Sequence, residues 1–136
     1  MARNHRDNIV PIPKGLSDVS EEVNIHDCGS ASSIECQIND DRLMSIDCIT
    51  IDDFVRDNQL ERVDLIKFDV EGAEERVLRG AIETIKRWKP KLAISAYHKN
   101  DDFIVLGKLI KSLNPNYRLH LGHGSTVYYE SVIFAV

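Results

Sequence analysis

Five side chains that can exchange protons lie at the ends of predicted strands or in the turns beside them. They are Asp69, Glu71, His98, His123 and Glu130. In an open parallel sheet, ligands bind outside the carboxyl ends of the strands. A final antiparallel strand returns its first residues to that same edge, so we expect all five side chains at one rim. Such a rim could hold an acceptor group and take its proton during a group transfer.

Each of these residues has a structural interpretation beside the functional one. Asp69 could have the structural role of capping the following helix. Its place at a strand end instead favours a catalytic role, with Asp69 or His98 as the base. Glu71 could orient an acceptor hydroxyl or a cofactor, or simply belong to a turn. His123 and Glu130 would line the substrate rim or be polar loop residues. Two histidines and several carboxylates on one rim would also allow a divalent metal, but no ligands share metal-binding spacing on one helix, so we assign no metal site.

Hydrophobic periodicity predicts the elements that position these residues. The run Val63–Val70 is typical of a strand buried on both faces. Apolar residues recur every three or four positions from Ala73 to Trp88, which predicts one helix that Pro90 ends. Further predicted elements are a strand at 91–97, a helix opening at Asp101 or Asp102, and strands at 117–121 and 131–136. This order predicts an α/β fold with a mostly parallel sheet and a C-terminal antiparallel hairpin.

The first 60 residues have weaker patterns. Alternation predicts strands at 22–26 and 43–51, and many Gly, Ser, Asn and Asp residues predict a loop at 28–41. Thr50 or Asp52 is expected to cap a short helix that runs through Asn58. The chain of 136 residues is expected to form a single domain.

Composition argues against several classes of partner. The net charge is −5 and the basic residues are scattered, whereas nucleic-acid binding needs clustered Lys and Arg. No apolar run approaches the roughly 20 residues that span a bilayer, and the N-terminus lacks the apolar region of a signal peptide. Three cysteines without a CxxC pair indicate reduced thiols. We therefore expect a cytoplasmic protein that binds neither nucleic acid nor membrane.

Three segments resemble a known family in both content and order. They are Ile51–Phe54 (IDDF), Asp64–Glu74 (DLIKFDVEGAE) and Val77–Ala81 (VLRGA). The chain resembles S-adenosylmethionine-dependent methyltransferases of the FkbM family from about Asn8 to the C-terminus. The resemblance implies a Rossmann-like class I methyltransferase fold and S-adenosylmethionine as the cofactor. It also implies O-methylation of a small-molecule acceptor, such as a sugar or another natural product.

The turn Gly15–Asp18 also resembles a turn of that family. By this resemblance Ser17 and Asp18 would meet the adenine, and Asp69 would complete the cofactor site. The family's glycine-rich turn and its ribose-binding acid are expected before Ile9, and the 136 residues do not contain them. The chain is therefore predicted to be a single partial domain, residues 1–136, with a truncated fold that is inactive as an isolated fragment.

Two other functions compete with methyl transfer. The chain could be a non-catalytic remnant that acts as a binding or oligomerisation module. It could also be a phosphoacceptor receiver domain, because 64–70 resembles a strand that ends in a phosphorylated Asp. That fold needs an acidic pair after its first strand and a Lys after its last parallel strand, and neither is correctly placed here.

The edge of the predicted strand Val63–Val70 suggests self-association. Without a neighbouring strand, its backbone would be a template for pairing, and Lys67 is the only charge within 65–68. Pro11, within the segment 9–12, and Pro13, directly after it, remove two amide donors and make that segment a poor substitute partner. We expect a homo-oligomer, specifically a dimer, with three residues at or near the contact. They are Leu65, Ile66 and Phe68.

Overall fold

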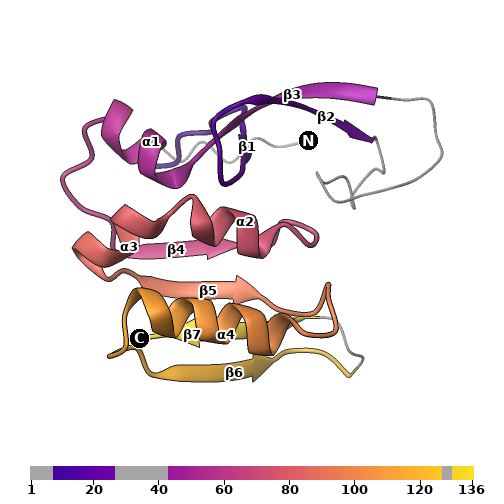
Figure 1. Cartoon of the computed structure of the whole chain (residues 1–136), viewed down its shortest axis with the longest axis vertical. Coiled ribbons are helices and arrows are strands. Elements are labelled where there is room, and N and C mark those ends of the chain that lie inside the picture. Colours follow the sequence, from indigo (N-terminus) through magenta and orange to yellow (C-terminus); the bar gives the residue numbers. More distant parts are fainter. Residues whose placement is uncertain (1–7, 27–42, 127–129) are drawn as a thin grey trace.

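The computed structural model describes residues 8–26, 43–126 and 130–136, which form an α/β fold with two sheets (Figure 1). The smaller sheet has the order β1-β3-β2 and precedes a short helix. Its strands and that helix are β1 (Gly15–Leu16), β2 (Glu22–His26), β3 (Leu43–Ile49) and α1 (Ile51–Asp57). The strand predicted at 22–26 is confirmed, and the loop predicted at 28–41 lies outside the described residues.

The larger sheet has the order β4-β5-β7-β6. Its strands are β4 (Leu65–Phe68), β5 (Lys91–Ser95), β6 (Leu119–His123) and β7 (Ser131–Ala135). β4 and β5 are parallel, but β7 lies antiparallel between β5 and β6. The prediction of a mostly parallel sheet was therefore wrong, because the final strand inserts into the sheet and makes two antiparallel ladders. The C-terminal antiparallel hairpin is confirmed.

β4, β5 and β6 nevertheless point the same way, since both β5 and β6 run antiparallel to β7. Their carboxyl ends therefore meet at one edge of the sheet, together with the start of β7. The loop before β7 was predicted to include Gly122 and His123, but both residues belong to β6. The edge on which the five predicted site residues should gather thus exists in the fold.

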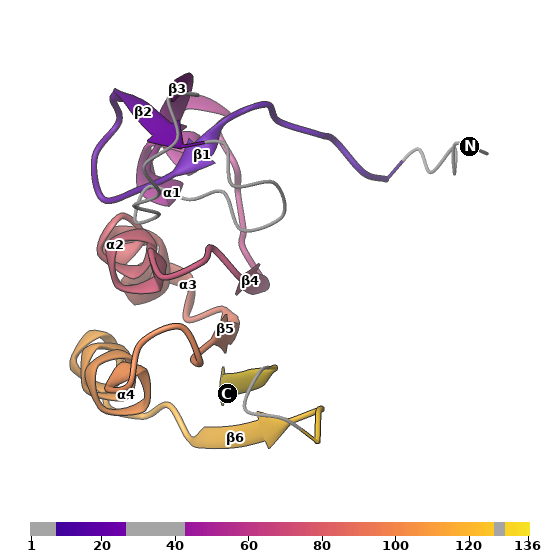
Figure 2. The same cartoon turned by 90° about the vertical axis from the view of Figure 1, so that its right-hand side faces the viewer.

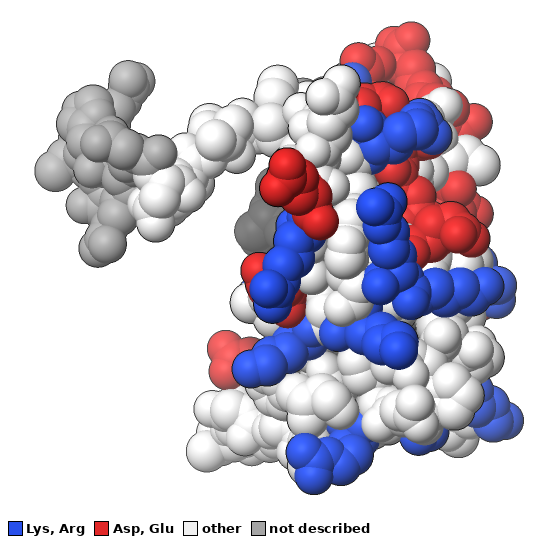
Figure 3. Space-filling view, turned by 90° about the vertical axis from the view of Figure 1, so that its left-hand side faces the viewer, with Lys and Arg blue, Asp and Glu red and all other residues white. Residues whose placement is uncertain are grey.

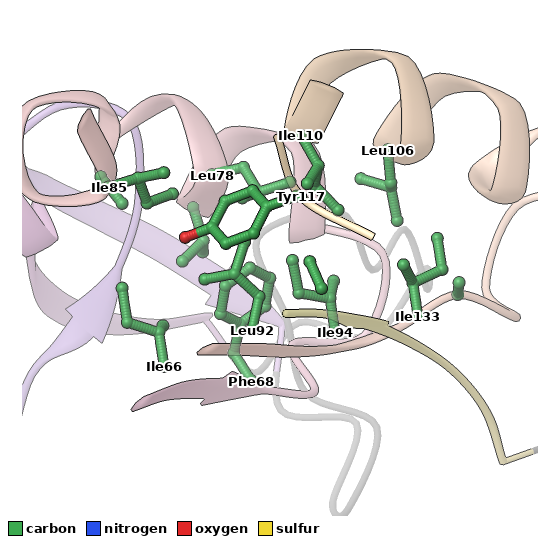
Figure 4. Close-up of a cluster of buried hydrophobic side chains, with 14 residues drawn as sticks. Ile66, Phe68, Leu78, Ile85, Leu92, Ile94, Leu106, Ile110, Tyr117 and Ile133 are labelled. Atoms are coloured by element: carbon green, nitrogen blue, oxygen red, sulfur yellow. The ribbon is translucent and has the colours of Figure 1, made fainter. Parts of the chain in front are cut away.

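Three helices cover one face of the larger sheet (Figure 2). They are α2 (Glu74–Arg79), α3 (Ile82–Trp88) and α4 (Asp102–Leu113). Figure 4 shows Leu78, Leu106 and Ile110 reaching from the helices toward the strand residues Leu92 and Ile94. All five side chains are fully buried or nearly so, and they belong to one continuous apolar core. Burying this apolar face is what holds helices and sheet together.

β4 is buried on one face only. Ile66 and Phe68 point into the core, whereas Leu65 is 60% exposed and Lys67 is exposed. The prediction of a strand buried on both faces was wrong, because a run of four apolar-rich residues does not show whether a second layer covers it. β4 also lies at the end of the strand order, so one of its backbone edges has no neighbouring strand among the described residues.

The helix predicted from Ala73 to Trp88 is divided at Gly80. A Cβ at this position would lie 2.2 Å from the carbonyl oxygen of Ser17, so only glycine lets the β1 turn approach so closely. The apolar periodicity continues across the break, which is why it does not show in the sequence pattern. Lys89, in the left-handed conformation with φ 50°, and Pro90 then end α3 as predicted.

Two polar residues near α1 have different capping roles. The Thr50 hydroxyl accepts a hydrogen bond from the Asp53 amide at 2.9 Å and caps α1, as one of the two predicted alternatives required. Asp52 instead accepts from the amides of Glu83 (3.0 Å) and Thr84 (2.8 Å), so it caps α3 from a different helix. Asp52 thereby joins the N-terminal half of the chain to the helical layer.

Two further features concern the surface and the thiols. Lys and Arg side chains spread across the face in Figure 3, and acidic side chains gather at its upper right. Cys48 is buried as a free thiol, and burial raises its pKa above the ordinary value. Within residues 8–26, 43–126 and 130–136, no helix is long and apolar enough to cross a bilayer.

Candidate active site at the ends of β4 and β5

The candidate site is built from the turns that follow β4 and β5. Asp69 follows β4 directly, Tyr97 and His98 follow β5, and Glu74 opens α2. Between β4 and α2, Glu71 adopts φ 50°, a left-handed conformation that residues with a Cβ rarely take. Such strain persists only where the surroundings enforce it, and it is common at functional sites.

His98 lies among three carboxylates. Its Nε2 is 3.2 Å from Glu71 Oε2 and 3.7 Å from Asp69 Oδ1, and its Nδ1 is 2.9 Å from Glu74 Oε1. The His98 side chain is only 11% exposed, whereas those of Asp69 and Glu71 are more than one-third exposed. The imidazole therefore connects a buried carboxylate to two that face solvent.

Glu74 is the buried member of this cluster, with a side chain that is 1% exposed. Its Oε1 accepts a hydrogen bond from the Val70 amide at 3.1 Å. Among the described residues, Glu74 Oε2 and both His98 ring nitrogens lack a hydrogen bond of acceptable geometry. The His98 contacts are thus close in distance but not aligned as hydrogen bonds. Buried polar atoms in native proteins are usually satisfied, so these atoms require an explanation.

Tyr97 supports the exposed side of the cluster. Its hydroxyl donates to the carboxylate of Asp69, at 3.1 Å from Oδ1 and 3.2 Å from Oδ2. The Tyr97 and His98 rings are tilted against each other with centroids 4.1 Å apart. Burial, followed by the neighbouring Asp69 carboxylate, raises the pKa of Tyr97 to about 12. The hydroxyl therefore stays protonated at neutral pH and remains a donor that orients Asp69.

Asp102 fixes the loop that carries His98. This buried carboxylate accepts hydrogen bonds from the amides of His98 (3.0 Å) and Lys99 (2.8 Å) at the start of α4. Either Asp101 or Asp102 was predicted to open this helix. Asp101 occupies the cap position without a side-chain bond, and Asp102 is the first helical residue. Asp102 therefore ties the end of β5 to α4.

His123 and Glu130 lie at the same edge of the sheet but at the hairpin end. His123 ends β6, and its Nδ1 is 2.8 Å from the hydroxyl of Ser131. Two strand spacings separate β6 from β5, or about 10 Å. The structure thus brings Asp69, Glu71 and His98 into one cluster and places His123 and Glu130 to one side of it.

Ser17 and Asp18 hold the β1 turn against α2. Ser17 is 1% exposed, and its hydroxyl donates to Asp18 Oδ1 at 3.0 Å. Arg76 Nε donates to the same carboxylate oxygen at 2.8 Å, which lowers the pKa of Asp18 below its ordinary value. These contacts give both residues a structural role, and their role toward adenine stays a prediction.

Comparison with known proteins identifies the family. The model of the methyltransferase FkbM domain matches residues 3–124. The chain belongs to the FkbM methyltransferase family. The crystal structure of methyltransferase FkbM from Methylobacillus flagellatus KT matches 90% of this chain with a TM-score of 0.69 and 28% sequence identity. This FkbM chain spans 27% of the length of that protein. No curated protein matches this chain.

Two residues of the cluster were missed in the sequence. Glu74 was placed in the segment Asp64–Glu74 that resembles the family, and Tyr97 in the strand predicted at 91–97, but neither was assigned a role in the site. Glu74 could have been found, because it stands three and four residues before Val77 and Leu78, on the apolar face of α2. An acid on such a face needs a partner. Tyr97 gives no comparable signal.

Proposed function

We propose that this FkbM domain supplies the acceptor side of an S-adenosylmethionine-dependent O-methyltransferase that acts on a hydroxyl of a sugar or another small natural product. The observation that carries the proposal is the position of His98 between the buried Glu74 and the exposed Asp69 and Glu71. A base oriented by a second, buried group is the usual arrangement for taking a proton from a hydroxyl nucleophile. Membership of the family supports methyl transfer as the reaction.

The residues of the cluster would have separate roles in the reaction. Asp102 holds the backbone of His98, and Glu74 lies beside its Nδ1, so that Nε2 faces the exposed carboxylates of the rim. Tyr97 orients the Asp69 carboxylate. Asp69 or His98 would take the acceptor proton as the oxygen forms its new bond to carbon, and Glu71 would orient the hydroxyl. Positioned proton transfer of this kind contributes roughly 10²–10⁴-fold to rate.

The exposed carboxylates also fit the charge of the methyl donor. S-adenosylmethionine would supply an electrophilic methyl group, whose bonding electrons remain on the sulfur as the carbon–sulfur bond breaks. Its sulfonium is positive, and Asp69 and Glu71 place two negative groups at the rim. In the part of the chain that the structure describes, no glycine-rich turn joins a strand to a helix, so we expect the chain alone to bind the donor weakly and to be inactive.

The test is transfer of labelled methyl from S-adenosylmethionine to a panel of sugars and other hydroxyl compounds. It is run with the 136-residue chain and with a chimera preceded by the N-terminal part of the Methylobacillus flagellatus protein. We expect transfer by the chimera only, with a 10²–10⁴-fold loss in Asp69→Asn or His98→Gln. His123→Gln is the control, because His123 lies outside the cluster.

Two results would contradict the proposal. A chimera that binds the donor but methylates no hydroxyl compound would remove the assigned reaction. Near-normal methyl transfer by both Asp69→Asn and His98→Gln would show that neither residue is the base. Micromolar affinity of the 136-residue chain for the donor, measured by calorimetry, would overturn only the expected weak binding.

A second candidate function, an oligomerisation module, is favoured by the edge of β4 that has no neighbouring strand in the described ranges of the chain. An apolar cavity of about 370 Å³ runs between this edge, α1 and the β1 segment, and its lining includes the exposed Leu65. We propose that a second copy of the chain pairs with β4 edge to edge. A symmetric interface needs a self-complementary surface, and an antiparallel pair of identical apolar strands supplies one.

Sedimentation of the chain at high micromolar concentration tests this second function. We expect a dimer that Leu65→Lys converts to a monomer. Ile104→Lys is a matched control, because Ile104 is also 60% exposed but lies on α4. A monomeric wild-type chain would refute self-association, and a dimer that survives Leu65→Lys would place the contact elsewhere.

A further inference from the structure

We propose that Asp69, Glu74 and His98 bind a divalent first-row metal ion. Each of them offers one ligand atom, and these three atoms lie within 4.8 Å of one another. The ligands come from the end of β4, the start of α2 and the end of β5. No two of them share the spacing of ligands on one helix, which is why the sequence predicted no metal site.

The spacing of the three ligand atoms suits a single ion after a small adjustment. Oxygen and nitrogen ligands bind such ions at about 2.0–2.2 Å, so ligand atoms in tetrahedral or octahedral sites lie about 3–4 Å apart. The three ligand atoms lie within 4.8 Å of one another, so their largest separation exceeds this range by less than about 1 Å. Rotation of the partly exposed Asp69 side chain could supply that difference, since the other two ligands are held within the fold.

The unsatisfied atoms of Glu74 and His98 are independent evidence for a ligand. Glu74 is fully buried, and in the described part of the chain its Oε2 has no hydrogen-bond partner. Both ring nitrogens of the nearly buried His98 are in the same condition. Buried charges are normally paired or coordinate metals. A cation between these side chains would bind a Glu74 oxygen and one His98 ring nitrogen, and it would offset the burial of a carboxylate.

The charge and the donor atoms indicate the class of ion. Three carboxylates, including Glu71 at 3.2 Å from His98 Nε2, surround one imidazole. Such a surplus of negative charge favours a divalent cation. Imidazole nitrogen suits Zn²⁺ and related transition metals, whereas two carboxylates suit Mn²⁺ as well. Mg²⁺ and Ca²⁺ prefer oxygen ligands alone. We therefore assign the site to Mn²⁺ or Zn²⁺, with the exposed side of Asp69 open to water or an acceptor oxygen.

This inference deepens the proposed function, because it concerns the same rim, but it rests on contacts within the cluster and not on methyl transfer. A metal ion at this position would hold an acceptor hydroxyl and favour loss of its proton. With the ion bound, Asp69 and His98 would act as its ligands and not as the base. Binding can be measured without a methyl donor. Failure to bind metal therefore leaves the methyl-transfer proposal standing, and failure to transfer methyl leaves the metal site standing.

The first test is titration of the metal-free 136-residue chain with Mn²⁺, followed by electron paramagnetic resonance of the free ion, and with Zn²⁺ by calorimetry. We expect one site per chain. Glu74→Gln, His98→Gln and Asp69→Asn should each weaken binding at least 10-fold. Glu75→Gln is the matched control, since Glu75 is the next residue, carries the same charge and pairs with Arg79 on the surface. Its affinity should be unchanged.

A second measurement needs no variant and covers the case in which Glu74→Gln fails to fold. In the wild-type chain, substoichiometric Mn²⁺ should broaden the imidazole resonances of His98 before those of His123. Absence of binding up to millimolar Mn²⁺ and Zn²⁺ would overturn the proposal. Equal affinity of the cluster variants and the Glu75→Gln control, or equal broadening at both histidines, would do the same.

Discussion

Alanine in place of Gly80 will destabilise the fold, because it inserts a methyl group where two segments of backbone meet. The new Cβ would lie 2.2 Å from the Ser17 carbonyl oxygen and 3.3 Å from the Thr50 Cβ. Gly80 has φ −75°, so alanine itself fits the backbone and would otherwise stabilise the chain by about 0.4–1 kcal/mol through the unfolded state. Backbone cannot rotate away as a side chain can. The clash therefore outweighs the gain from the unfolded state, and the net effect of Gly80→Ala is to destabilise the chain.

The magnitude follows from these opposing effects. Overpacking costs about 1–3 kcal/mol, so a net loss of about 1–2 kcal/mol remains. For a domain of this size, each kcal/mol lowers the melting temperature by about 3–5 °C. We therefore expect a fall of about 3–10 °C in thermal denaturation followed by circular dichroism, with a matching fall in the urea midpoint.

Gly107→Ala is the matched control for this substitution. Gly107 lies inside α4, and a Cβ there would meet Leu119 Cδ1 at 3.7 Å, an ordinary contact. Alanine should therefore stabilise the chain by about 0.5–1 kcal/mol. Opposite signs for the two substitutions are the expected result. A Gly80→Ala chain as stable as wild type would show that the Ser17 turn is not packed against Gly80 as described.

Two further predictions concern carboxylates that join the halves of the chain. Asp52→Ala should lower the free energy of unfolding by about 0.5–2 kcal/mol in urea, because the amides of Glu83 and Thr84 lose their acceptor; an unchanged value would refute the capping role. The pKa of Asp18 is lowered, mainly by the hydrogen bond from Arg76, so this pair stabilises the fold above the pKa of an unfolded Asp, about 3.9. That contribution is lost as pH falls through the lower pKa of the folded state. It should not exceed about 1 kcal/mol, since both side chains are about one-third exposed, and Arg76→Met should abolish this part of the pH dependence.

Local patterns predicted the elements of this fold well where one face decides the structure. The periodic residues around Leu78 and Leu106 do pack on the sheet, and Thr50 does cap α1. Asp69, Glu71 and His98 could be placed at one edge because strand direction alone puts them there. The family follows from ordered segments, which the match over residues 3–124 confirms.

What the sequence could not predict depends on contacts distant along the chain. The division of the helix at Gly80 depends on Ser17, and the second capping role of Asp52 depends on α3. The insertion of β7 between β5 and β6 is a choice of neighbour that hydrophobic alternation does not encode. Glu74 belongs to the site because the fold places it beside His98, which lies 24 positions further along the chain.

The shared direction of β4, β5 and β6 also separates several charged side chains between the two edges of the larger sheet. Three carboxylates lie at the carboxyl ends of β4 and β5, whereas the basic side chains of Lys89, Lys91 and Arg118 lie near the amino ends of β5 and β6. A cationic small molecule that approaches this field will be turned and drawn toward the acidic rim before it makes any contact. Salt at about 0.15 M limits that attraction to a range of about 8 Å. The capture rate of a positively charged ligand will therefore fall as ionic strength rises, while that of a neutral acceptor will not change.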